Sequence, residues 1–146
     1  MSKEGTCQNC YSYGMVELHH IIKKSQASFL RDCELNFIHL CPNCHRGTFG
    51  VHGREGNKLD FKIRLDYQNK IEMLLIKEAY TKEQLKELLK INSSSIDSLC
   101  KLTQCEKGTF NREDILRTLC GGKLITENET KEIEKRCNFE PTRNIR

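Results

Sequence analysis

Two short cysteine pairs constrain the fold of this chain more than any other feature of its sequence. The segments Cys7-Gln-Asn-Cys10 and Cys41-Pro-Asn-Cys44 each separate two thiols by two residues. This spacing lets both sulfur atoms bind one tetrahedral Zn²⁺ at about 2.3 Å. A single pair would also fit a redox site or ordinary buried cysteines, but two pairs favour a metal. The sequence therefore predicts a structural zinc site formed by Cys7, Cys10, Cys41 and Cys44.

The remaining cysteines have no such spacing, and we expect each of them to be a small, buried, apolar residue. The total of 9 is odd, so an all-disulfide scheme would leave one thiol unpaired. A chain of 146 residues buries a modest core, and zinc binding would supply part of the folding free energy of a small N-terminal unit. The cysteines outside the pairs are Cys33, Cys100, Cys105, Cys120 and Cys137.

Composition narrows the class of protein without naming an activity. The net charge of +4 permits nucleic-acid binding but does not demonstrate it. The sequence contains no apolar run of the roughly 18 residues that a membrane span needs, and its first residues do not resemble a secretory signal. We therefore expect a cytoplasmic protein, within a bacterial host if a phage encodes it. Oligomeric state is not indicated.

Histidines are confined to the same region as the cysteine pairs, at positions 19, 20, 39, 45 and 52. Hydrolysis of a phosphodiester needs a base that takes a proton from water and a cation that neutralises charge on the phosphate. Neighbouring histidines can divide these tasks, because an imidazole serves either as a base near neutral pH or as a metal ligand. By strand alternation His39 faces away, and we expect no role for it.

The segments Glu17-Leu-His19-His20 and Asn36-Phe-Ile-His-Leu-Cys41-Pro-Asn-Cys44-His45 together closely resemble the HNH endonuclease family over residues 7–53. The resemblance implies an α+β fold: a small, zinc-stapled ββα-metal core, treble-clef-like, followed by a mostly helical C-terminal region. It further implies that His20 is the general base, that His19 and His45 bind a divalent catalytic ion, and that Asn36 braces the loop between the strands. Mg²⁺, Mn²⁺, Ni²⁺ and Zn²⁺ are all candidates for that ion.

The third ligand departs from the pattern, because colicin-type members carry a histidine where this chain has Phe49. The glycines between residues 47 and 53 do not suit a regular helix. We expect the helix to stop early and His52 to supply the third ligand, with Cys33 or Glu17 as alternatives. The Gly-Val-His-Gly ending resembles phage-encoded HNH nucleases. A histidine such as His45 could instead belong to the zinc site.

The chain divides into a core at 1–56, a connecting segment at 57–80 and a small helical region at 81–146. Apolar spacing predicts a connecting helix over 60–79, although residues 59–67 also alternate as a strand would. Thr81 with Gln84, and Thr126 with Glu129, form capping boxes that open helices. Two further helices are expected to carry Ile96 and Leu99, and Ile115 and Leu119, the second ending at Gly121-Gly122. Residues 140–146 form a basic tail.

The helical region has two interpretations. Its leucines favour a small bundle that packs on the core. Alternatively, residues 81–122 resemble a helix-turn-helix unit that would present Ser94, Asp97, Lys101 and Gln104 to DNA. We prefer the packing role, and expect phosphate contacts from cations that flank the histidines: Lys23, Lys24, Arg31, Arg46 and Arg54.

Together these features predict a metal-dependent endonuclease that nicks or cuts DNA and leaves 5′-phosphate and 3′-hydroxyl ends, as the family resemblance implies. The alternative is a non-catalytic zinc-finger DNA-binding or regulatory protein, in which the cysteines matter and the histidines do not. The residues also allow an RNA substrate, and they do not indicate a recognition sequence.

Overall fold

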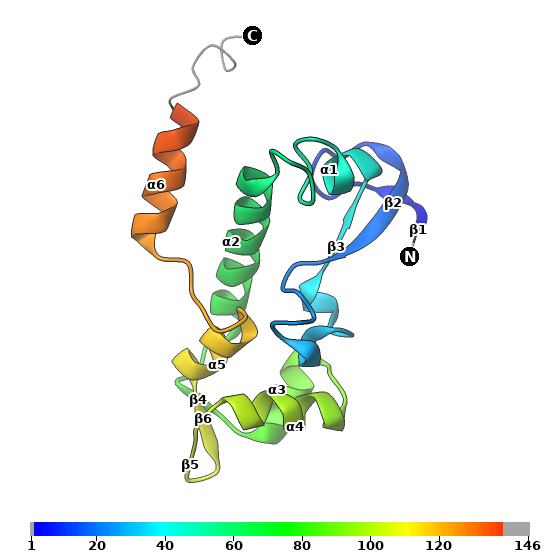
Figure 1. Ribbon diagram of the computed structural model, residues 1–146. Helices are drawn as coiled ribbons and strands as arrows, with labels where there is room; N and C mark the ends of the chain where they lie inside the picture. Colours follow the sequence, from blue (N-terminus) through cyan, green and yellow to red (C-terminus); the bar gives the residue numbers. More distant parts are fainter. Residues whose placement is uncertain (1, 139–146) are drawn as a thin grey trace.

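The computed structural model describes residues 2–138, and it mixes α-helices with two small antiparallel sheets (Figure 1). The expected tail at 140–146 lies outside the described residues. One sheet and a short helix form the N-terminal part, which holds both cysteine pairs. A long helix leads from it to the helical part, which contains the second sheet (Figure 1). None of the described helices is both long and apolar enough to span a bilayer.

The N-terminal sheet has the strand order β1-β2-β3, with strands β1 (Ser2–Thr6), β2 (Tyr13–His20) and β3 (Phe37–Leu40). Strands β2 and β3 lie between the cysteine pairs and pair antiparallel, which places His19 opposite Ile38. Helix α1 (Pro42–Arg46) follows at once and contacts both strands. It opens with a proline at its first position, where the missing N–H costs no helical hydrogen bond.

The loop between β2 and β3 packs partly into the core of the molecule. It contains two short 3-10 helices, η1 (Ser28–Leu30) and η2 (Glu34–Asn36). Phe29 and Leu30 are buried in the larger of two apolar cores, together with residues from the helical part of the chain. The loop that begins directly after His20 therefore fastens the N-terminal sheet to the helices.

Helix α2 (Asn57–Leu74) connects the two parts. The extended alternative for residues 59–67 is wrong, because Ile63, Tyr67 and Ile71 recur at helical spacing and are buried. The helix ends at Leu74, earlier than expected. The side chain of Arg112 donates to the carbonyls of Glu72, at 2.8 Å, and Leu75, and so satisfies acceptors at the helix end.

Four further helices follow, and their starts agree with the capping residues in the sequence. Thr81 and Gln84 form the expected capping box, and Thr126 and Glu129 exchange the same pair of hydrogen bonds. Asn92 and Asn111 cap the two helices between them through their side chains. The helices are α3 (Lys82–Leu89), α4 (Ser93–Leu102), α5 (Arg112–Leu119) and α6 (Glu127–Asn138).

The second sheet was not expected. Its strands are β4 (Ala79–Tyr80), β5 (Cys105–Glu106) and β6 (Thr109–Asn111), in the order β4-β6-β5. Strands of two or three residues are too short to show an alternating pattern, so the sequence gives no signal for them. The sheet leaves Cys105 exposed at an edge strand.

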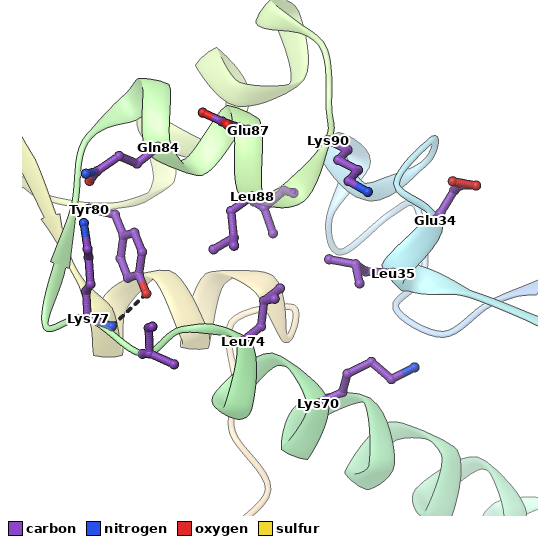
Figure 2. Close-up of a pocket in the computed structure, with 12 residues that line it drawn as sticks. Glu34, Leu35, Lys70, Leu74, Lys77, Tyr80, Gln84, Glu87, Leu88 and Lys90 are labelled. Atoms are coloured by element: carbon purple, nitrogen blue, oxygen red, sulfur yellow. Dashed lines mark hydrogen bonds between the residues drawn. The ribbon is translucent and has the colours of Figure 1, made fainter.

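A hollow of about 720 Å³ lies where α2 ends, between α3 and the η2 turn (Figure 2). Leu35, Leu74 and Leu88 line it, and Lys70 and Lys90 stand at its rim. The backbone N–H of Lys77 donates to the Tyr80 hydroxyl at its wall, at 2.8 Å. No histidine or paired cysteine borders this hollow, so it is separate from the candidate site.

Candidate functional site

The two cysteine pairs meet at the base of the N-terminal sheet. The Sγ atoms of Cys7, Cys10, Cys41 and Cys44 all lie within 4.8 Å of one another. The Sγ atoms of Cys10 and Cys41 are 3.8 Å apart. Two thiolates on one tetrahedral Zn²⁺ are separated by about the same distance, roughly 3.8 Å, given Zn–S bonds of about 2.3 Å. The four thiols can therefore hold a metal such as zinc, as the spacing predicted.

Backbone amides around Cys7 favour its thiolate form, which binds a metal, whereas burial raises the pKa of Cys44 to about 12. The N–H groups of Asn9 and Cys10 donate to the Sγ of Cys7, and that of Cys44 donates to the Sγ of Cys41 at 3.4 Å. Burial alone would raise the pKa of the Cys7 thiol, but hydrogen bonds from backbone amides of Cys10, Cys41 and Asn9 lower it to about 6.

The other cysteines differ from one another. Cys33 and Cys120 are buried, as expected, and Cys100 is partly buried. The expectation is wrong for Cys105, which β5 turns to solvent at the edge of its sheet. The Cys137 side chain lies outside the described residues.

Three of the histidines form a second cluster, separate from the cysteines. One ring nitrogen from each of His19, His45 and His52 lies within 4.8 Å of the others. Their ring centroids are 4.8 to 5.3 Å apart. His19 comes from the end of β2, His45 from α1, and His52 from the turn that follows α1. The structure therefore brings together the three residues that the sequence assigned to a catalytic ion.

The turn that carries His52 is built from closely approaching backbone. The N–H of His52 donates to the carbonyl of His45 at 2.9 Å, which fixes one histidine relative to the other. A Cβ on Gly53 would lie 1.8 Å from the carbonyl oxygen of Gly47, and a Cβ on Gly56 would lie 1.9 Å from that of Gly50. Only glycine fits these positions. The helix does stop early, at Arg46, and the turn then presents His52.

His19 is the most enclosed member of the cluster, with 7% of its surface exposed. Its Nε2 atom is buried and finds no hydrogen-bond partner within the described part of the chain. Buried polar atoms nearly always have a partner, so this nitrogen fits an ion as its missing partner. Burial, followed by the charges of His52 and His45, lowers the pKa of the ring to about 4, and a neutral ring is the form that binds a metal.

Glu17 orients His45 instead of joining the cluster. Its Oε1 accepts a hydrogen bond from Nδ1 of His45 at 2.7 Å and another from Nε of Arg46 at 3.0 Å. Hydrogen bonds from Arg46 and His45 lower the pKa of Glu17 to about 2, so the carboxylate is ionised and can only accept. The Nδ1 of His45 must then carry the proton, which leaves Nε2 as its free lone pair.

Cys33 does not join the cluster either. Its thiol is buried in the larger core and donates to the carbonyl of Leu89 at 3.4 Å. Of the three candidates for the third ligand, only His52 has a nitrogen in the cluster. The alternative that His45 replaces a cysteine in the zinc site does not fit either, because all four thiols already converge.

His20 directly follows His19 on β2 and affects that ring electrostatically, but it does not belong to the cluster. Its Nε2 is 2.8 Å from the carbonyl oxygen of Arg31. Because a carbonyl cannot donate, Nε2 must carry the proton, and the neutral ring then has its lone pair on Nδ1. His20 therefore has a fixed tautomer, as His45 does, but its nitrogens lie outside the converging group.

Asn36 ties the two ends of the loop together. Its side chain is fully buried, accepts from the N–H of Ile22 at 2.7 Å, and donates to the carbonyl of Ile22 at 3.0 Å. Its own carbonyl accepts from the N–H of Ile21 at 2.9 Å. Both residues directly follow His20, so the amide holds the backbone that carries that ring.

Comparisons were made with family models, with curated proteins and with solved structures. None matches this chain. Its function must therefore be argued from the geometry of its own residues.

The cations expected near the site fall into two groups. Arg46 is bound to Glu17, and Arg31 forms an ion pair with Asp32 at 2.9 Å. Lys23, Lys24 and Arg54 are exposed and form no ion pair with any residue that the structure describes. The sequence interpretation did not assign the Glu17–Arg46 contact. A signal existed, because Glu17 lies two residues before His19 and shares its strand face.

Proposed function

We propose that this chain is a metal-dependent endonuclease of the HNH type that hydrolyses phosphodiester bonds of DNA. One observation carries the proposal: three histidines converge on one point, while a fourth, His20, directly follows His19 and has its lone pair on Nδ1. A purely structural zinc protein needs only the cysteine cluster. It gives no reason for a second group of ligands with a potential base next to it.

The histidine cluster has the properties of a site for a divalent ion. His19 contributes a buried, unpartnered Nε2, and His45 contributes an Nε2 whose ring is held through Nδ1 by Glu17. A divalent ion bound there would neutralise the charge that builds on the phosphate and the leaving oxygen. His52 supplies the third ring nitrogen of the group.

His20 supplies the proton acceptor. Its Nε2–H remains bonded to the Arg31 carbonyl, so Nδ1 is the nitrogen that takes a proton from water. The same carbonyl stabilises the ring once it becomes positively charged, because it continues to accept from Nε2–H. Asn36 keeps this ring in place through its bonds to Ile22.

Exposed cations near the histidines support DNA as the substrate. Lys23 lies close enough to His19 and His52 to affect both rings electrostatically. Lys24 and Arg54 flank the same region and are free to contact phosphates. Such contacts position a duplex without reading its sequence. The proposal therefore assigns backbone binding, rather than base recognition, to this part of the chain.

The test compares His20→Ala with His39→Ala in a plasmid-nicking assay with added Mg²⁺, Mn²⁺ or Ni²⁺. His39 is a matched control, because it lies on the adjacent strand and has no ligand atom in the cluster. Loss of a general base should lower the cleavage rate by about 10²- to 10⁴-fold. His39→Ala should cut as the wild type does, and both variants should retain zinc.

A wild-type protein that contains zinc, binds duplex DNA and cuts in none of these ions would overturn the nuclease proposal. The chain would then be a non-catalytic zinc-dependent DNA-binding protein. Cleavage of single-stranded RNA, but not of plasmid, in the same assay would keep the chemistry and change the substrate.

A further inference from the structure

Helices α3 and α4 are joined by a turn of three residues, Lys90, Ile91 and Asn92. Lys90 adopts the left-handed conformation (φ 54°) that ends α3, Ile91 is buried beneath the turn, and the Asn92 side chain caps α4 by accepting from the N–H of Ser95. A turn of this length also joins the two helices of a helix-turn-helix unit, whose second helix enters the major groove of DNA.

We propose that this unit, together with the β5–β6 hairpin, binds duplex DNA through the exposed face of α4. The two faces of α4 differ as this role requires. Ile96 and Leu99 point inward and are almost completely buried. Ser94, Asp97 and Lys101 follow at helical spacing on the opposite side and are exposed.

The outward face carries groups that suit a base edge or a phosphate. Asp97 is the one carboxylate within α4, and Lys82 of α3 binds it in an ion pair. Lys86 lies beside the start of the helix, where its Nζ donates to the Ser93 hydroxyl at 2.7 Å. Lys101 at the other end has no such partner among the described residues. Cations therefore lie along the face, and its one anion is neutralised.

The β5–β6 hairpin adds a second contact beside α4. Lys107 and Gly108 form its turn, and both have positive φ (53° and 82°), as a tight two-residue hairpin requires. The hairpin projects at the bottom of the molecule, to the left of α4 in Figure 1. Its exposed Lys107 is the residue through which the hairpin would contact a phosphate.

A protein partner fits this surface less well than DNA does. Helices that dock on proteins present apolar anchors at helical spacing. The outward stripe of α4 carries hydroxyl, carboxylate and ammonium groups instead, and Leu102 is the one large apolar residue of this helix that is strongly exposed. Charge and hydrogen-bonding capacity both favour a nucleic-acid duplex.

The packing of α4 also connects it to the histidine cluster. Its neighbour is η1, in the loop that starts after His20, and both belong to one apolar core. A duplex bound by α4 would therefore be cut at a fixed distance from the sequence that α4 reads. This connection rests on the proposed function, whereas DNA binding by α4 does not.

The binding test uses the full-length His20→Ala protein and a pool of duplexes with a random central segment. Repeated selection should enrich one sequence. The double variant Ser94→Ala/Lys101→Ala should bind the enriched duplex roughly tenfold or more weakly, with a smaller loss for an unselected duplex. Lys131→Ala on α6 is the matched control, because this lysine is exposed on another helix.

Lys107→Ala should weaken binding to every duplex equally and reduce the slope of log K against log salt by about 1. Failure of the pool to enrich any sequence, or unchanged affinity of the double variant for the enriched duplex, would overturn the role of α4. Circular dichroism identifies variants that fail to fold. If binding follows these expectations but the wild type cuts no DNA in any ion, the nuclease proposal fails and this one stands.

Discussion

His52 and His45 are joined by a backbone hydrogen bond, in which the N–H of His52 donates to the carbonyl of His45 at 2.9 Å. The two side chains therefore do not reach the cluster independently. The glycine-rich turn after α1 positions both of them, so a change in this turn should alter the proposed metal site.

Gly53→Ala should disrupt the histidine cluster while leaving the cysteine cluster intact. The added Cβ would lie 1.8 Å from the Gly47 carbonyl, so the turn must shift and carry His52 with it. We expect a stability loss of about 1–3 kcal/mol and a loss of Ni²⁺ binding beyond the zinc equivalent. Calorimetric titration measures the binding. Gly5→Ala is the control, since its Cβ meets only the Val16 side chain at 3.4 Å; equal Ni²⁺ binding by both variants would contradict this account.

Glu17→Gln should weaken metal binding at the histidines without removing a ligand. The carboxylate accepts from His45 on Oε1 and from Arg46 on both oxygens, whereas the amide has one acceptor and would turn an NH2 group toward either Arg46 or His45, so the His45 ring is held less firmly. Changes of this kind lower metal affinity by about 10- to 100-fold. A metal titration of the zinc-loaded protein checks it, with Glu4→Gln on β1 as control. Unchanged affinity would show that Glu17 has no part in positioning His45.

Asn36→Ala should destabilise the loop that carries His20. The substitution removes the hydrogen-bond partner of the buried N–H and carbonyl of Ile22, and each unsatisfied group lowers the stability by about 1–3 kcal/mol. Urea unfolding should show the loss, whereas Asn69→Ala, at an exposed position of α2, should change little. A variant as stable as the wild type would mean that water satisfies these groups and that Asn36 is not the brace.

Cys10→Ser should release zinc and loosen the N-terminal sheet. The thiol of Cys10 is one of four that converge, and a hydroxyl is a poor zinc ligand. Because zinc binding contributes folding free energy, amide exchange in β1 and β2 should rise, while the buried core of α3 to α5 stays protected. Cys105→Ser, at an exposed thiol outside the cluster, is the control. Equal zinc content in the two variants would argue against a zinc site made of four cysteines.

Much of the local structure could be predicted from the sequence, because short-range chemistry determines it. The capping pairs Thr81–Gln84 and Thr126–Glu129 begin helices where the sequence places them. The pairing of cysteines two residues apart, and the early end of the helix before the glycines, follow from spacing and backbone sterics alone. The convergence of His52 with His19 and His45 was expected from the family resemblance and the glycine-rich turn.

Only the tertiary structure decided which long-range partners these residues have. It placed Glu17 in contact with His45 and Arg46, buried Cys33 in the larger core, and brought the side chain of Arg112 to the carbonyls at the end of α2. It also formed a sheet from strands too short to leave a pattern. The physical reason is the same in each case: spacing determines contacts between near neighbours, whereas contacts between distant residues depend on how all the elements pack together.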